Sequence, residues 1–300
     1  MNRAYRLALH WLLIVCPAGF GCRFRSLEGP VPRSLILSRQ LSQQGMSAME
    51  RGNWARADDL LAQAVKVFPQ DADARYHYAE VLWHRGEKLA AVEQLDKALQ
   101  LAPDDPKLLL RAAQMRIAMG RPDEAGDLIQ RGIDADSKNP AAWTLRGRLR
   151  RQAGERREAL ADYHRALGYR PDDRETLLEA AEVYRELNQP LRALATLQNL
   201  SDTYPPGEEP PQVLYLTGLA YGALGRHAEA VECLSLLRDR GAATTDALCQ
   251  LAEAQCEVGR ESEARHTAAQ ILAAAPGERR AVALLERLDV ARHKGGSGYR

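Results

Sequence analysis

Residues 72–105 read ADARYHYAEVLWHRGEKLAAVEQLDKALQLAPDD, and the spacing of small residues in this stretch recurs along the chain every 34 positions. Gly86 separates two segments with helical apolar spacing, and Pro103 closes the unit. This order predicts a helix, a turn, a second helix and a stop. A repeat of this length indicates a solenoid of stacked helix pairs, because one such unit cannot bury its apolar face alone.

Small side chains return at two places in each of seven copies of this unit. The copies begin at Ser38, Ala72, Pro106, Pro140, Arg174, Pro211 and Thr245. The eighth place is always glycine or alanine, and the twentieth is always alanine, at Ala57, Ala91, Ala125, Ala159, Ala193, Ala230 and Ala264. Paired helices approach closely only where neither presents a long side chain. These places therefore predict where the two helices of each pair cross.

Each unit also carries residues that end its helices. The fifteenth place is glycine in six copies and Asn188 in the fifth copy, and both residue types tolerate a left-handed backbone. Proline stops a helix. It fills the thirty-second place of most copies, at Pro69, Pro103, Pro171, Pro205 and Pro276, with Ser137 and Ala242 as the departures.

This pattern of small eighth, glycine fifteenth, alanine twentieth and proline thirty-second residues resembles the tetratricopeptide repeat (TPR) family. Trp143 and Tyr184 stand where the family pattern has aromatic residues. The chain departs from the pattern at the twenty-seventh place of the last three copies, where Leu200, Leu237 and Ile271 replace alanine. The resemblance implies an all-α fold, a right-handed α-solenoid of about seven TPR helix hairpins with a C-terminal capping helix.

The repeats divide the chain into segments. We expect TPR repeats 1–5 at 38–207 and repeats 6–7 at 211–278, with an insertion at 208–210 as the joint between the two blocks. The remaining segments are a linker at 23–37 that becomes helical near Ser34, a capping helix over the last repeat at 279–293 and a flexible tail at 294–300.

Residues 1–22 have the layout of a signal peptide, in which two arginines precede a short apolar run and small residues follow. The run is shorter than the ~20 apolar residues that a membrane-spanning helix needs. Gly21 before Cys22 resembles the lipidation site of bacterial lipoproteins, although the two residues before Gly21 depart from that motif. We expect export to the cell envelope with lipidation at Cys22; plain secretion, an uncleaved anchor and a cytoplasmic location remain alternatives.

The repeats contain no phosphate-binding loop, nucleophile elbow, HExxH or CxxC motif. We therefore expect a protein that is not an enzyme, without catalytic residues or a cofactor. His77, Glu80 and His84 share one face of a predicted helix. Because the two histidines lie two turns apart, a polar groove wall is favoured over a metal site.

The TPR resemblance implies that the first helix of each pair lines the concave side, through its second, fifth, sixth, ninth, twelfth and thirteenth places. The partner-binding residues predicted at these places are Tyr76, His77, Glu80, Trp83, His84, Arg111, Gln114, Arg148, Arg151, Glu179 and Glu182. The basic residues of repeats three and four, next to Tyr76 and Trp83, form the strongest candidate site, because arginine and aromatic residues dominate interface energetics. A solvated charged face is the alternative.

A formal net charge of +1 over 300 residues gives no reason to expect a nucleic-acid partner. We expect a TPR scaffold that binds protein or peptide segments along its concave groove. Contact with a membrane is expected only through an N-terminal anchor. The alternative is a structural subunit packed permanently in an envelope or secretion assembly.

Overall fold

The structure, a computed structural model, describes residues 32–296 and contains fifteen α-helices and no strand in that range. The helices are α1 Arg33–Glu50, α2 Trp54–Val67, α3 Ala72–His84, α4 Lys88–Leu101, α5 Pro106–Ala118, α6 Pro122–Ala135, α7 Pro140–Gln152, α8 Arg156–Tyr169, α9 Arg174–Glu186, α10 Pro190–Ser201, α11 Pro211–Ala223, α12 His227–Asp239, α13 Thr245–Glu257, α14 Glu261–Ala274 and α15 Arg279–Gly296. None of these helices is long and apolar enough to cross a membrane. The predicted signal segment 1–22 and the lipidation of Cys22 lie outside the described residues.

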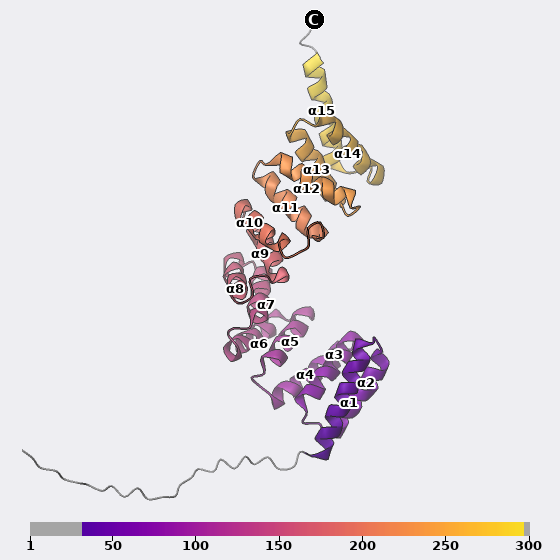
Figure 1. Cartoon of the computed structure of the whole chain (residues 1–300), viewed down its shortest axis with the longest axis vertical. Helices are drawn as coiled ribbons and strands as arrows, with labels where there is room; N and C mark the ends of the chain where they lie inside the picture. The colour runs from indigo at the N-terminus through magenta and orange to yellow at the C-terminus, as the bar shows by residue number, and fades with distance from the viewer. Residues whose placement is uncertain (1–31, 297–300) are drawn as a thin grey trace, which may run out of the picture.

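The helices pack as consecutive hairpins. Each odd-numbered helix from α1 to α13 packs chiefly on the helix that follows it, and each second helix also contacts the first helix of the next pair. The hairpins stack into an elongated array with α1 at one end and α15 at the other (Figure 1). The prediction of an all-α solenoid of helix hairpins is confirmed.

Small residues let the two helices of each hairpin approach closely. All seven alanines of the twentieth place are at most 2% exposed. A Cβ atom on Gly147 of α7 would lie 2.5 Å from Cε1 of Tyr163 in α8. The other two eighth-place glycines meet leucines in the same way, in the pairs Gly45–Leu61 and Gly218–Leu234. The eighth place of the first helix therefore receives the twenty-fourth residue of the repeat.

The turn within each hairpin uses a residue with a left-handed backbone. The six fifteenth-place glycines have φ between 71° and 85°, and Asn188 has φ 54°. The residue after each of them donates its N–H to the carbonyl five residues earlier, as Gln189 does to Tyr184 at 2.9 Å. This bond supplies a donor to one of the last carbonyl groups of the first helix, which have no partner within the helix. The left-handed turns expected from the fifteenth place are confirmed.

Side-chain caps start most of the first helices. The residue before the helix accepts an N–H from the first turn of α3, α5, α7 and α9, and these residues are Asp71, Asp105, Asn139 and Asp173. They are spaced by one repeat length, so the cap is part of the repeat. A cap of this kind typically contributes ~1 kcal/mol to helix stability. The second helices α2, α4, α6 and α8 are thus followed at a fixed distance by a defined start of the next hairpin.

Packing continues across the insertion at 208–210. Leu200 of α10 belongs to the same buried apolar cluster as Val213 and Leu216 of α11. Nη1 of Arg240 donates to the Glu209 carbonyl at 2.9 Å and fixes the loop to α12. The apolar core therefore extends from one side of the insertion to the other.

The terminal helices extend beyond the predicted boundaries. α1 begins at Arg33, inside the linker segment 23–37 and one residue before Ser34, near which a helix was expected; Pro32 directly precedes α1, and no glycine or proline follows until Gly45. α15 ends at Gly296, three residues past the predicted end at 293. Glycine disfavours a helix by only about 1 kcal/mol relative to alanine, so the glycines there do not stop α15.

We expect Gly147→Ala to lower the free energy of unfolding by about 1–3 kcal/mol, because the added methyl group overlaps the Tyr163 ring. Gly126→Ala is the matched control, since a Cβ at Gly126 lies 3.7 Å from its nearest neighbour, Leu149. The control should raise stability by about 0.5–1 kcal/mol, because alanine is the better helix former. Urea midpoints of both variants measure the difference. Equal midpoints would show that the hairpin does not depend on this contact.

We expect Asn188→Ala to destabilise the fifth hairpin by about 1 kcal/mol, because alanine is strained at φ 54°. Asn188→Gly should be at least as stable as the natural chain, because glycine adopts this backbone without strain. Thermal melting of the three proteins tests the order. If the alanine variant matches the glycine variant, the turn does not require a left-handed residue.

Candidate functional site

The predicted partner-binding residues lie on four first helices, α3, α5, α7 and α9. The structure brings eight of them into two clusters, Tyr76, Glu80, Arg111 and Gln114 on α3 and α5, and Arg148, Arg151, Glu179 and Glu182 on α7 and α9. His77 packs edge-on against Tyr76, with the ring centroids 5.0 Å apart. Trp83 and His84 belong to neither cluster.

Arg111 of α5 and Glu80 of α3 form a two-point ion pair. Nε of Arg111 donates to Oε1 of Glu80 at 2.5 Å, and Nη2 donates to Oε2 at 2.8 Å. The two side chains are 25% and 21% exposed. Nη1 of Arg111 donates to Oε1 of Gln114 at 3.2 Å. The guanidinium of Arg111 is therefore engaged within the protein on all three of its nitrogens.

A denser ionic network joins α7 to α9. Nε of Arg148 and Nη1 of Arg151 each donate to a different oxygen of Glu179 at 2.8 Å. Nη2 of Arg151 donates at 2.6 Å to both Glu182 and Glu186. Burial lowers the pKa of the Arg151 guanidinium, but its hydrogen bonds to the three glutamates outweigh burial and raise that pKa above its ordinary value. The basic and acidic residues predicted from the sequence thus neutralise one another across neighbouring repeats.

Four of the contacts between neighbouring first helices share one separation in the sequence. Residues 31 apart meet in the pairs Glu80–Arg111, Arg148–Glu179, Arg151–Glu182 and Tyr215–Asp246. Because the repeat is 34 residues long, places that differ by about one helical turn face each other on adjacent first helices. Complementary polar residues 31 apart are therefore a signal in the sequence that the groove prediction did not use.

The junction between repeats three and four breaks this series. The residue 31 positions after Gln114 is Leu145, which is buried and 6% exposed. A hollow of about 450 Å³ opens beside this junction, between α3, α5 and the start of α7. Its polar lining is Tyr76, Asp105, Lys107, Arg111, Gln114 and Asn139, and we call it the α5 hollow. Three of the predicted site residues line it, whereas the helix caps Asp105 and Asn139 were not predicted to do so.

Two basic residues line the α5 hollow, and Lys107 is the one that is not paired with a carboxylate within residues 32–296. Its Nζ lies 3.9 Å from the centroid of the Tyr76 ring. Burial and the nearby Glu80 raise the pKa of the Tyr76 hydroxyl, which keeps its proton at neutral pH. Burial and Lys107 lower the pKa of the His77 imidazole, so His77 is neutral there. The positive charge beside Tyr76 therefore belongs to Lys107.

Trp83 and His84 are the last two residues of α3, and they do not line the α5 hollow. The His84 ring stacks on Trp54 of α2 with centroids 3.5 Å apart and an interplanar angle of 11°. Nζ of Lys88 lies 5.6 Å from the Trp83 centroid. Among the described residues, no group of three or more histidines, cysteines or carboxylates is placed to hold a metal ion.

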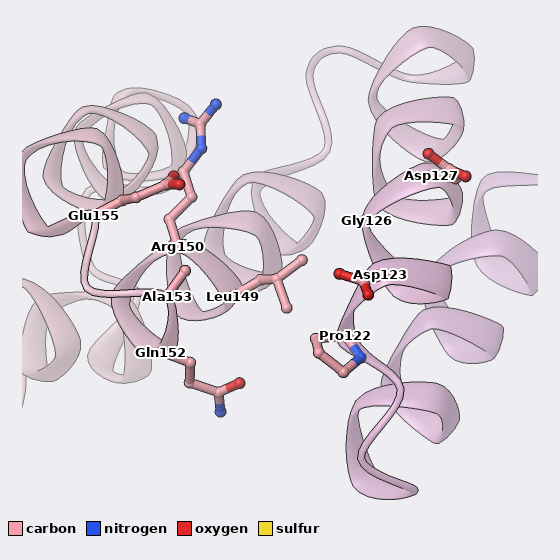
Figure 2. A pocket seen from close by; sticks show the side chains of 9 residues that line it. All are labelled: Pro122, Asp123, Gly126, Asp127, Leu149, Arg150, Gln152, Ala153 and Glu155. Carbon is pink, nitrogen blue, oxygen red and sulfur yellow. The ribbon is translucent and has the colours of Figure 1, made fainter.

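A second hollow, of about 590 Å³, lies between α6 and α7 (Figure 2). Pro122 and Leu149 face each other across it, and Asp123 projects from the start of α6 (Figure 2). Arg150 of α7 donates to Asp162 at 2.8 Å, so its charge is paired within the protein. None of the predicted partner-binding residues lines this second hollow.

Curated relatives of this chain are much longer proteins. Cellulose synthase operon protein C of Xanthomonas axonopodis pv. citri (strain 306) is 28% identical over 220 residues, which are 71% of this chain and 14% of that protein. The protein of the same name from Pseudomonas fluorescens (strain SBW25) is 29% identical over 198 residues, which are 63% of this chain and 15% of that protein. The chain thus spans only a small part of the length of these relatives.

Solved structures of similar fold cover most of the chain at low identity. PilF of Pseudomonas aeruginosa has a TM-score of 0.65 at 18% identity and covers 75% of this chain and 100% of its own. PilW, a widely conserved type IV pilus biogenesis factor, has a TM-score of 0.63 at 20% identity, covering 71% and 96%. YrrB, a TPR protein with an unusual peptide-binding site, has a TM-score of 0.59 at 16% identity, covering 65% and 99%. At these identities the likeness concerns the fold.

Sequence models of the family described as tetratricopeptide repeat match this chain at several places. One model matches residues 42–106, 144–208 and 178–243, and a second matches 89–149. Together the matches run without a gap over 42–243, which is more than half of the chain. The matched repeats, the buried alanines and the left-handed turns agree, and the chain belongs to the tetratricopeptide repeat family.

Proposed function

We propose that this chain is a non-enzymatic scaffold that binds a segment of a partner protein along its concave side, with the α5 hollow as the main contact. The observation that carries the proposal is the α5 hollow itself, where Lys107 has no ion-pair partner within residues 32–296, whereas Arg111, Arg148 and Arg151 are paired with glutamates. Stacked repeats suit an extended or helical peptide, because they offer successive contacts along one face. YrrB, which is similar in fold, is a TPR protein with a peptide-binding site.

We propose further that the chain is exported to the bacterial cell envelope through residues 1–22 and held there by a lipid on Cys22. PilW, which is similar in fold, is a pilus biogenesis factor, and the curated relatives are cellulose synthase operon proteins of bacteria. Pili and cellulose are both delivered to the cell exterior, so these relatives support an envelope setting. The basic and apolar layout of the N-terminal segment supports export.

A structural subunit of an envelope assembly is the second candidate. Leu89 of α4 and Leu191 of α10 are 71% and 70% exposed at the same place of their repeats. They lie on second helices, outside the groove that the first helices line. Exposed leucines at such positions would suit contacts through the outer surface rather than through the α5 hollow.

We expect Gln114→Trp to abolish capture of partner proteins that bind in the groove, because the exposed Gln114 lies at the α5 hollow and an indole would fill it. Gln63→Trp makes the same exchange at an exposed position of the second helix α2 and should leave capture unchanged. Quantitative mass spectrometry of proteins crosslinked to each variant in bacterial membranes measures the difference. Partners retained by Gln114→Trp but lost by Leu89→Glu would favour the structural-subunit candidate.

We expect Arg151→Met to lower the free energy of unfolding at pH 7 by about 1–3 kcal/mol, because its charged hydrogen bonds to the glutamates of α9 are lost. Burial raises the pKa of Glu186, but bonds from Arg151 and Arg156 lower it below its ordinary value of 4.5. A lowered pKa stabilises the fold above about pH 4.5, and this contribution disappears as the pH falls through the folded-state pKa.

The loss of unfolding free energy caused by Arg151→Met should therefore be smaller at pH 3.5 than at pH 7. Urea midpoints of both proteins at both pH values measure it. Arg157→Met is the control, because Arg157 is exposed on α8 and forms no ion pair within residues 32–296. A loss of equal size at both pH values would contradict the ionic account.

A further inference from the structure

We infer that the second hollow, between α6 and α7, binds an arginine or lysine side chain of a partner protein. This contact lies outside the α5 hollow and adds a binding surface that the proposed function does not include. Three features of the second hollow support it. These are the missing side chain that opens it, its apolar floor and the charge of its rim.

The second hollow exists because the third repeat lacks a side chain at the twenty-first place. Gly126 stands there, whereas four other copies carry Val92, Leu160, Leu194 and Val231, which pack in apolar clusters that include the next first helix. Gly126 lies within the helix α6, and a Cβ there would be 3.7 Å from Leu149, an ordinary contact. Neither the backbone nor a neighbour therefore requires glycine at this position.

The missing side chain leaves the floor of the hollow apolar and partly uncovered. Leu149 is at the tenth place of its repeat and is partly exposed. The apolar tenth-place residues of the other first helices are at most 6% exposed, and these are Val81, Met115, Val183, Ala220 and Ala254. Pro122 faces Leu149 across the hollow (Figure 2). The volume of about 590 Å³ is in the range of ligand pockets, so an aliphatic chain can pack on this floor.

The rim of the hollow is acidic. Asp123 and Asp127 lie four residues apart on α6 and so share one face of the helix, and Glu155 lines the hollow from the turn after α7. None of the three forms an ion pair within residues 32–296. Nη1 of Arg150, the basic residue of the lining, donates to Asp162 at 2.8 Å, and its guanidinium is turned away from Asp123 (Figure 2). The lining therefore has an excess of negative charge.

An apolar floor below an acidic rim selects the class of ligand. Lysine and arginine side chains pack their aliphatic stems on apolar surface while the charged head stays in polar surroundings. In the second hollow the stem lies on Pro122 and Leu149, and the head reaches Asp123 and Asp127. A metal ion would not use the floor, and no group of residues in the described part of the chain is placed to hold one.

The test uses the purified full chain and capped decapeptide libraries whose random positions hold only uncharged residues. One central position is fixed as Arg, norleucine or Glu, and a photoreactive leucine beside it crosslinks the peptide to its binding surface. Arg peptides should be retained about tenfold better than norleucine peptides, since one charge-assisted contact is worth roughly that factor. Glu peptides should be retained least. Mass spectrometry should locate the crosslinks of the Arg peptides in residues 122–127 and 149–155.

Gly126→Leu should abolish the preference for Arg, because the added side chain fills the hollow. Gly168→Leu makes the same exchange on α8, where no atom lies within 4 Å of an added Cβ, and should keep the preference. Asp123→Asn combined with Asp127→Asn should also remove it. Asp59→Asn, at the place that corresponds to Asp127 in the first repeat, should not. Urea midpoints show that each variant is folded.

Equal retention of Arg and norleucine peptides would overturn the inference, because the hollow would then bind apolar side chains regardless of charge. A preference for Arg that survives in Gly126→Leu, or crosslinks that map to other residues, would also overturn it, since the basic side chain would then bind elsewhere. Gln114→Trp tests the α5 hollow, which is a different surface. Failure here therefore leaves the proposed function standing.

Discussion

Every hairpin of this protein depends on the close approach of its two helices where the eighth residue is glycine or alanine. Gly147 leaves room for the ring of Tyr163, and a methyl group there would overlap the ring at 2.5 Å. Protein interiors are packed too densely to absorb such an overlap without a shift of the neighbouring helix. The small residue thus sets how closely the second helix approaches the first. Repetition of this contact gives successive hairpins the same geometry.

A constant hairpin geometry explains the ionic series along the first helices. Because each hairpin repeats the previous one, residues 31 apart face each other at several junctions, such as Glu80 with Arg111 and Arg148 with Glu179. The same side chains would be solvated charges on an isolated hairpin. Removing one partner of an ion pair that is partly shielded from solvent leaves the other charge uncompensated, which destabilises the fold. The groove wall therefore also helps to hold the stacked hairpins together.

The sequence was sufficient to predict the repeat, the crossing and the turns, because each depends on a steric limit that only small or left-handed residues satisfy. Asn188 at φ 54° follows this rule in place of glycine. Proline proved dispensable, since α6 ends at Ala135 with Ser137 in the thirty-second place, where Asp136 accepts the N–H of Lys138 at 3.1 Å. Which charged side chains of the groove form ion pairs could not be predicted from each repeat alone. Whether Arg151 is paired, for example, depends on the offset between neighbouring first helices.

The α5 hollow lies beside a junction that has no pair of residues 31 apart, whereas such pairs join repeats two and three, four and five, and six and seven. Leu145 occupies the position where a polar partner for Gln114 would lie, and it is buried in the apolar core instead. The amide of Gln114 and the ammonium of Lys107 then face solvent beside Tyr76, whereas Arg148 and Arg151 of α7 pair with Glu179 and Glu182 of α9. If every polar side chain in the groove of a repeat protein were paired within the fold, few of them would be free to bind a ligand. We therefore expect recognition at the α5 hollow, where polar side chains remain without partners in the described part of the chain.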